Sequence, residues 1–172
     1  MTDKPKFRKT PLDPNQRGIK KAFSMVQSFA VALASRNINN NKINKPIKQL
    51  RVLSCFGNEN VGGELPACEY LDQSTTDPTK HICGGCGCGD RKQTFLVANA
   101  DEYGKLDYPK LACPLQMPGF TNYTISTSDE AEEPVTRKYY IENIDYDVMH
   151  DLDVAVGKQE QPPENPEEEN KE

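Results

Sequence analysis

The chain has 172 residues, of which 35% are hydrophobic and 27% are charged. A length close to the roughly 150 residues of one typical domain excludes a large multidomain enzyme. No uninterrupted apolar run approaches the ~18 residues needed to cross a bilayer, which argues against a membrane span and a membrane partner. We therefore expect one small core and terminal segments that cannot fold alone.

Charge is distributed unevenly along the chain. Residues 1–51 carry twelve Lys and Arg against two Asp, a net charge of +10. Residues 127–172 carry four Lys and Arg against fifteen Asp and Glu, a net charge of −11. Because a basic segment attracts phosphates and carboxylates, the pattern predicts a protein or anionic partner for the N-terminal region, with nucleic acid as one alternative.

The N-terminal region is expected to be a basic disordered arm over residues 1–13 and an amphipathic helix over residues 14–36. Asp13 and Pro14 suit the start of a helix. Apolar residues then recur at helical spacing, at Ile19, Ala22, Phe23, Val26, Phe29, Ala30 and Leu33. Residues 20–34 also fit a signal peptide. Their late start and regular period favour the helix and, with it, a cytoplasmic location.

A linker is expected over residues 37–49, because Asn and Lys dominate it and Pro46 interrupts helical hydrogen bonding. The segment from Leu50 to Phe56 resembles a short strand that runs into a turn at Gly57. Residues 50–125 alternate Gly, Pro, Cys and short apolar pieces, which indicates a cysteine-rich metal-binding domain. The predicted fold class is α+β, small and irregular, with short strands around a metal-stapled core.

The cysteines carry the main functional indication. All six lie in the central domain, at Cys55, Cys68, Cys83, Cys86, Cys88 and Cys113. Cys83 and Cys86 form a CxxC pair followed by Gly87, a spacing that lets two thiolates converge on one ion while glycine permits the tight turn. The motif from Cys83 to Gly87 resembles the CxxCG knuckle of zinc ribbons and rubredoxins. This resemblance implies metal binding, although the sequence lacks the second CxxC of those families.

A closed tetrahedral zinc site needs four ligands. The expected ligands are Cys68, Cys83, Cys86 and Cys113. Cys88 is the reserve ligand, because it forms a C-x-C pair with Cys86; Cys55 and His81 are the remaining candidates. Zinc suits a core this small, because a structural metal contributes free energy to folding.

Two alternatives remain for the same residues. An iron–sulfur cluster is one, because Pro114 follows Cys113 as in bacterial ferredoxin motifs, and residues 85–89 resemble the Cys-Gly-Cys-Gly segment of A-type iron–sulfur carriers. The cysteine spacing differs from that of a standard ferredoxin. Disulfides or free thiols are the other alternative, and disulfides would require an oxidising compartment.

The apolar residues of the loop after Cys113 are expected to fold back into the small core rather than to dock a partner. These residues are Leu115, Met117 and Phe120, together with Leu106, Tyr108 and Leu111. Residues 126–157 are predicted to form an acidic linker and a possible second helix between Arg137 and Val156. Residues 158–172 form an acidic tail without large apolar side chains, which is expected to be disordered.

The acidic segment also contains a cluster that could bind a hard cation. Its members are Asp145, Asp147, His150, Asp151 and Asp153. A solvated helix face explains them better, because the spacing of an EF-hand loop is missing. The sequence also lacks the common phosphate-binding and nucleophile motifs. The expected function is therefore a non-catalytic zinc-binding interaction module, with an electron-transfer or redox-sensing role as the alternative if the metal is an iron–sulfur cluster.

Overall fold

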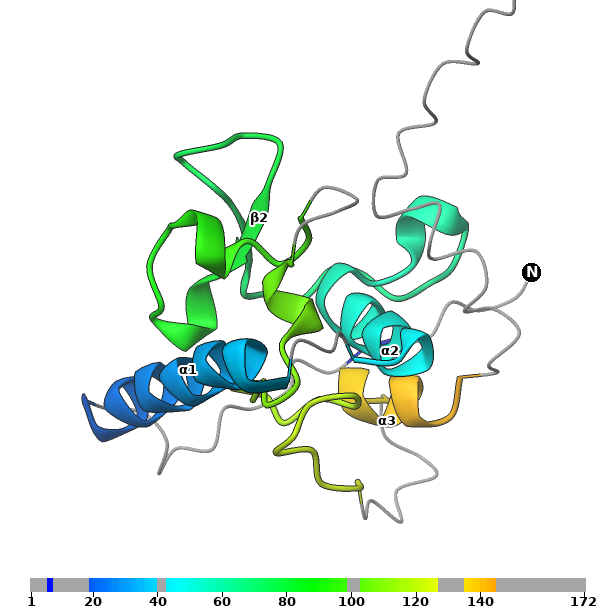
Figure 1. Ribbon diagram of the computed structural model, residues 1–172. Helices are drawn as coiled ribbons and strands as arrows, with labels where there is room; N and C mark the ends of the chain where they lie inside the picture. Colours follow the sequence, from blue (N-terminus) through cyan, green and yellow to red (C-terminus); the bar gives the residue numbers. More distant parts are fainter. Residues whose placement is uncertain (1–5, 8–18, 40–42, 99–102, 127–134, 145–172) are drawn as a thin grey trace, which may run out of the picture.

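The computed structural model describes residues 6–7, 19–39, 43–98, 103–126 and 135–144. In this part of the chain, three helices and a two-stranded antiparallel sheet are joined by long loops and short 3-10 turns (Figure 1). The architecture confirms a small, irregular α+β fold. The structure does not show the predicted metal staple, which becomes a proposal below.

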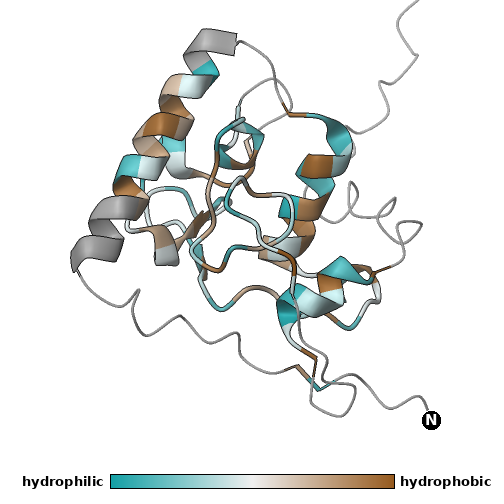
Figure 2. Ribbon diagram, turned by 90° about the horizontal axis from the view of Figure 1, so that it is seen from below, coloured by the Kyte–Doolittle hydropathy of each residue, from teal (hydrophilic) through white to brown (hydrophobic). Residues whose placement is uncertain are grey.

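Helix α1, Ile19–Asn39, confirms the predicted N-terminal helix and extends it by three residues at its C-terminal end. Residues 14–18 of the prediction, and the arm apart from Lys6 and Phe7, lie outside the described residues. Met25 and Ala32 are buried and stand seven positions apart, so they mark the face that packs on the rest of the molecule. Val26 and Val31 are nevertheless 46% and 49% exposed. Hydrophobic and hydrophilic residues alternate along the helix (Figure 2).

Helix α2, Lys45–Phe56, corrects two predictions. The segment from Leu50 to Phe56 is helical rather than a strand, and the linker predicted over 37–49 ends before Lys45. Asn44 caps the helix, because its side chain accepts a hydrogen bond from the Ile47 N–H at 3.1 Å. Pro46 falls in the first turn, where a missing N–H costs no helical hydrogen bond. The proline that was expected to exclude a helix therefore sits at its start.

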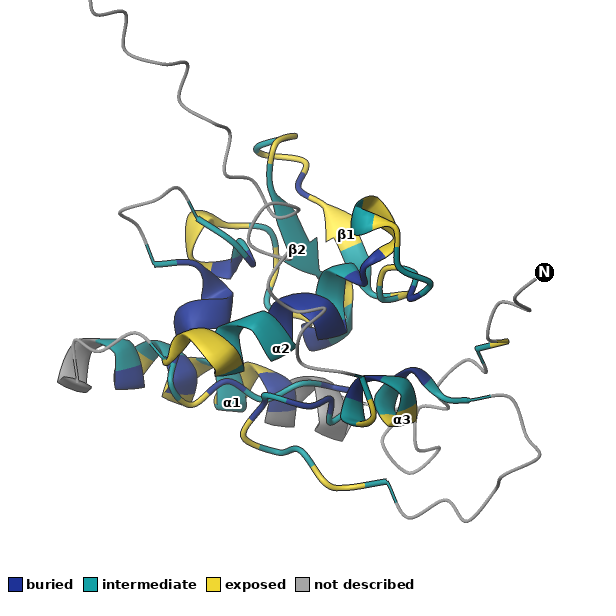
Figure 3. Ribbon diagram, turned by 90° about the vertical axis from the view of Figure 1, so that its right-hand side faces the viewer, coloured by how far each residue is buried: buried dark blue, intermediate teal, exposed yellow. Residues whose placement is uncertain are grey.

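The sheet consists of β1, Leu71–Gln73, and β2, His81–Cys83. The strands pair in the register Leu71 with Cys83 and Gln73 with His81. Strand β1 is largely exposed, whereas the middle of α2 is buried (Figure 3). The sheet is too short to build a core of its own, and its role is to fix the position of Cys83 at its end.

The core is formed mainly by loops that pack against α2. The six residues predicted to pack together are all buried: Leu106, Tyr108, Leu111, Leu115, Met117 and Phe120. The packing interpretation of the loop after Cys113 is confirmed. Such loops must satisfy their buried carbonyl groups, and Arg51 of α2 does so by donating to the carbonyl oxygens of Leu106 at 2.9 Å, Tyr108 at 2.8 Å and Gly119 at 2.7 Å.

Helix α3, Arg137–Glu142, packs beside α2 (Figure 1). It begins where the second helix was predicted, after Thr136, whose hydroxyl accepts a hydrogen bond from the Tyr139 N–H at 3.2 Å. The helix ends at Glu142 with Asn143 as its C-cap, so the predicted helix does not continue through the described residues 143–144. Residues 145–157 of the prediction, the acidic cluster and the C-terminal tail lie outside the described residues. The ring of Phe7 contacts Tyr140 edge-on at 5.0 Å between centroids, so this short N-terminal piece lies against α3.

Candidate functional site

The six cysteines are carried by four parts of the fold. Cys55 lies in the last turn of α2, and the Cys68 N–H donates to its carbonyl oxygen at 2.8 Å. Cys83 ends β2 and is followed by the 3-10 turn η3, Gly84–Cys86, which contacts α1. Cys86 is buried, and the other five cysteines are half-buried free thiols. Backbone pairing thus brings segments far apart in sequence into one thiol-rich region.

The glycines of the CxxC loop are required for close packing as well as for turning. A Cβ on Gly84 would stand 2.2 Å from an Asp72 carboxylate oxygen, and a Cβ on Gly85 would stand 2.8 Å from the Tyr70 ring. Gly87 has φ +62°, a left-handed conformation that strongly favours glycine. The predicted need for a positive φ is confirmed at Gly87. Glycine is needed at Gly84 and Gly85 for a different reason: Asp72 of β1 and Tyr70, the residue before β1, approach them closely.

Cys86 is the centre of the first thiol group. The ammonium of Lys105 donates to its sulfur at 2.9 Å, and the Cys88 N–H donates to the same sulfur at 3.3 Å. Hydrogen bonds from the Cys83 and Cys88 thiols, reinforced by Lys105, hold the pKa of Cys86 far below its usual range. The Cys86 sulfur also lies 3.2 Å from the Cys83 carbonyl oxygen. Cys86 could donate a hydrogen bond to this oxygen only as a protonated thiol. The charged ammonium favours the thiolate.

The second group contains Cys55, Cys68 and Cys113. Burial raises the pKa of Cys55 well above its usual value, and neighbouring Cys113 and Cys68 raise it further. Burial also raises the pKa of Cys68, and it raises the pKa of Cys113 to about 11. These thiols are therefore protonated at neutral pH unless a bound cation takes the place of their protons. Cys83 is linked to this group through its electrostatic interaction with Cys55.

Backbone N–H groups act on three of the sulfurs. The Cys88 N–H donates to the sulfur of Cys86 at 3.3 Å, and backbone hydrogen bonding at Tyr70, and at Leu115 and Met117, opposes the rise in the pKa of Cys68 and Cys113 that burial causes. The loop turns back over Cys113 through Gln116, which has φ +52°, a conformation that costs a non-glycine residue free energy. Each of these arrangements stabilises a negative charge on sulfur.

Two buried cations flank the thiols. Lys105 is 3% exposed and acts on the Cys83, Cys86 and Cys88 group. Burial alone would lower the pKa of Lys105, but the thiolate of Cys86 and its neighbours more than offset it, so the pKa is raised. Arg137 is 8% exposed, and Cys68 and Cys55 are the charges that act on it most strongly. Both cations thus face groups that become anionic when they lose a proton.

The predicted ligands are brought together in part. Cys83 and Cys86 are adjacent, Cys88 joins them, and Cys68 and Cys113 belong to the neighbouring group. Among the residues that the structure describes, no group of three or more His, Cys, Asp or Glu side chains stands in a geometry that could hold a metal ion. His81 instead contacts Phe56 edge-on at 5.5 Å between ring centroids.

Sequence reasoning missed the two cations and the closeness of Cys55 to Cys68. Lys105 lies nineteen positions after Cys86, and Arg137 lies in the acidic C-terminal third, so neither belongs to a local pattern with the cysteines. The contact of Cys55 with Cys68 depends on a backbone hydrogen bond between α2 and a loop. These relations come from tertiary packing, which spacing alone does not reveal.

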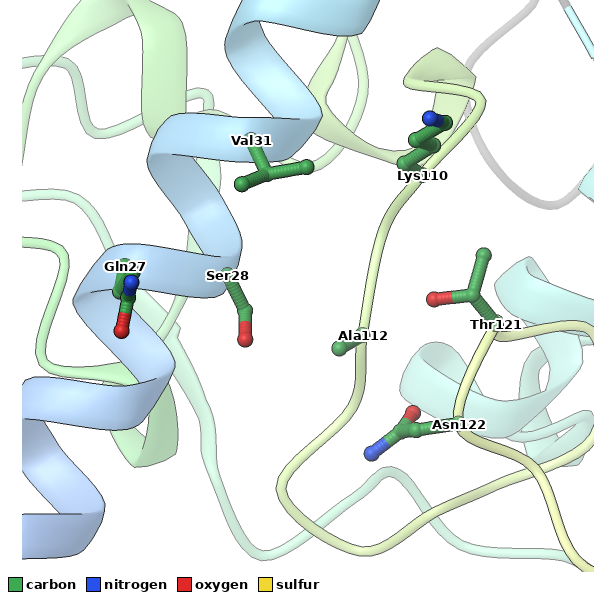
Figure 4. A pocket seen from close by; sticks show the side chains of 7 residues that line it. All are labelled: Gln27, Ser28, Val31, Lys110, Ala112, Thr121 and Asn122. Carbon is green, nitrogen blue, oxygen red and sulfur yellow. The ribbon is translucent and has the colours of Figure 1, made fainter.

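A separate cavity lies between the middle of α1 and the loops that carry Lys110 and Thr121 (Figure 4). Its volume is about 560 Å³, and it is lined by Gln27, Ser28, Val31, Lys110, Ala112, Thr121 and Asn122 (Figure 4). Asn122 is engaged with the backbone, since its amide accepts from the Cys113 N–H and donates to the Cys113 carbonyl, both at 2.8 Å. The lining contains no cysteine, so the cavity is distinct from the thiol-rich region.

Comparisons with known proteins do not add an identity. No family model matches the chain, and neither the curated proteins nor the solved structures contain a match. None of the helices in the described part of the chain is long and apolar enough to cross a membrane. The function must therefore be argued from the thiol-rich region itself.

Proposed function

We propose that the chain is a non-catalytic zinc-binding protein whose thiolate centre holds the central loops together. The observation that carries this proposal is the surroundings of the Cys86 sulfur, which accepts hydrogen bonds from the Lys105 ammonium at 2.9 Å and from the Cys88 N–H at 3.3 Å. Such bonds have little purpose for a neutral thiol, which is a weak acceptor. They stabilise a thiolate, the form in which cysteine binds zinc.

The proposed ligands are Cys68, Cys83, Cys86 and Cys113, with Cys88 in reserve. Zinc binding would release the remaining thiol protons to solvent and bring four sulfurs to ~2.3 Å from the ion. In the structure these four thiols are not arranged around a common point. Cysteine has a single side-chain torsion with three staggered positions, so changes of rotamer on an already assembled backbone are the motion that the proposal requires.

The binding-module part of the proposal rests on charge alone. Zinc with four thiolates has no open position for substrate, so the centre orders the loops and performs no chemistry. The basic residues 1–51 are then left to meet a protein or anionic partner. An iron–sulfur cluster on the same thiols would instead supply electron transfer or redox sensing. The hydrogen bonds to sulfur favour thiolate ligation in either case.

Elemental analysis and an absorption spectrum of protein purified without oxygen test the proposal. We expect about one zinc per chain and no visible colour. Iron and sulfide with a band at roughly 400 nm would favour the iron–sulfur alternative. Protein that contains no metal and takes up neither zinc nor iron would overturn the proposal.

Serine variants assign the ligands. Cys83→Ser and Cys86→Ser should each lower the zinc content and weaken the fold, because an alcohol is a far poorer ligand than a thiolate. Cys55→Ser is the matched control: its thiol lies in the same region but outside the proposed ligand set, so zinc should be retained. Full zinc content in the Cys83 variant, or its loss in the Cys55 variant, would reject this ligand set.

A further inference from the structure

We propose that Lys105 and Arg137 are the counter-charges of the thiolate centre, one on each side of it. This inference rests on the proposed function and deepens it. Zinc with four thiolates carries two net negative charges, and two buried cations balance them. The structure places the Lys105 ammonium 2.9 Å from the Cys86 sulfur, and it places the Arg137 guanidinium on the carbonyl groups of Ser54 and Ala67, the residues before Cys55 and Cys68.

The position of Lys105 suits a counter-charge to the thiolates. A buried ammonium needs an anionic partner, and its Nζ lies 2.9 Å from the sulfur of Cys86. The neighbouring buried carboxylate, Asp107, is already engaged: it lies 2.7 Å from Lys48 and accepts a hydrogen bond from the Gly104 N–H at 3.0 Å. Lys105 also lies over the Phe29 ring at 4.8 Å, so α1 covers it from water.

Arg137 reaches the other side from α3. Its guanidinium donates to the carbonyl oxygens of Ser54 at 3.5 Å, Pro66 and Ala67 at 2.6 Å. Ser54 precedes Cys55 and Ala67 precedes Cys68, so the cation is fixed by the backbone on which these cysteines are mounted. The charges that act on Arg137 are Cys68 and Cys55 first, and the carboxylates of Glu69 and Glu59 after them.

The expected consequence is tighter metal binding. Because metal competes with protons for each thiol, a nearby cation that favours the thiolate raises the apparent affinity. Groups that support metal ligands from outside typically change affinity by about 10–100-fold. Lys105 and Arg137 are thus positioning residues that act on the metal through the sulfurs.

Cobalt titration of the full chain tests this role, because cobalt reports both affinity and thiolate geometry in one spectrum. Lys105→Gln should weaken cobalt and zinc binding by about 10–100-fold while the tetrahedral thiolate spectrum at saturation stays unchanged. Lys105→Arg, which keeps the charge, should bind within about threefold of the original. Lys138→Met is the control and should have no effect, since Lys138 also lies over a ring, Tyr123 at 5.5 Å, but its ammonium donates to the Thr124 hydroxyl at 3.0 Å rather than to a sulfur.

The pH of zinc release gives a second measure of the lost affinity. Up to four protons compete with zinc for the ligands. In Lys105→Gln, a 10–100-fold loss of affinity should therefore raise the pH of half-maximal zinc release by roughly 0.25–0.5 unit. If that variant does not fold, Arg137→Lys and Arg137→Gln replace it, and weaker binding in the Gln variant alone supports the proposal.

The two hypotheses fail in different ways. If the unsubstituted chain binds zinc and the neutral variants bind it equally well, the counter-charge role is wrong and the metal site remains. Equal weakening in the neutral and charge-retaining variants shows a packing role and likewise overturns the inference. If the unsubstituted chain binds no thiolate-ligated metal, the proposed function itself is wrong.

Discussion

Single side chains with several hydrogen bonds determine how the loops of this protein are held. Arg51 is 2% exposed and joins α2 to three carbonyl groups on the loops that follow Gly104. Burial lowers the pKa of Arg51 to about 10, so the guanidinium remains charged at neutral pH. Its cationic group also lies 5.3 Å from the Phe120 ring centre. One residue thus replaces the hydrogen-bond ladder that a sheet would have supplied.

Arg51→Met should therefore lower the free energy of unfolding by about 3–5 kcal/mol, because the methionine fills the space but leaves three buried carbonyls without donors. Urea denaturation of both proteins at neutral pH measures the difference. Arg91→Met, a change of the same type at an exposed position, should stay within about 0.5 kcal/mol. A loss below about 1 kcal/mol for Arg51→Met would show that water or neighbouring donors satisfy these carbonyls.

At the scale of elements, α2 shows where sequence reasoning succeeds and fails. Asn44, Pro46 and Gly57 form a proper helix start and stop, although the sequence pattern predicts that Pro46 ends the preceding linker. In α1, the apolar period correctly predicts the helix. It does not identify the buried face, since Val26 is exposed and Met25 is buried, because apolar residues occupy more than one side of the helix.

The end of α2 depends on glycine for two reasons at once. Gly57 has φ +68°, and an added Cβ would stand 2.2 Å from the Leu65 carbonyl oxygen. Gly62 has φ +83° with nothing within 4 Å of an added Cβ. Gly62→Ala should thus cost only the left-handed backbone, about 1 kcal/mol. Gly57→Ala adds a clash with backbone, and at ψ −159° it adds a conformation that is essentially restricted to glycine, so it should cost at least about 2 kcal/mol more.

Chemical denaturation of the two alanine variants checks this difference directly. The pair is informative because both changes add one methyl group and both place alanine at positive φ. Similar losses of unfolding free energy would mean that the chain after α2 moves away from Leu65 at little cost. That result would contradict a fixed approach of this loop, which also carries Cys68.

For the molecule as a whole, the sequence predicts composition-driven features better than tertiary ones. The small α+β class, the buried loop after Cys113 and the start of α3 follow from local patterns of apolar residues and caps. The partners of the thiols do not, because Lys105 and Arg137 reach them from distant segments. Cysteine spacing finds the donors of the candidate site, whereas its electrostatic environment is a property of the fold.

Metal removal tests how far this loop-built fold depends on its thiol centre. The described sheet has two strands of three residues each, and much of the core is contributed by loops. Free zinc at about 1,000 times its dissociation constant would stabilise the folded chain by ~4 kcal/mol. At roughly 2–4 °C per kcal/mol for a chain of this size, a chelator should lower the melting temperature by about 8–16 °C. Circular dichroism of zinc-loaded and chelated protein measures the shift, and magnesium, which prefers oxygen ligands, should not reverse it. Equal melting temperatures would mean that Arg51 and the apolar core hold the loops without a metal.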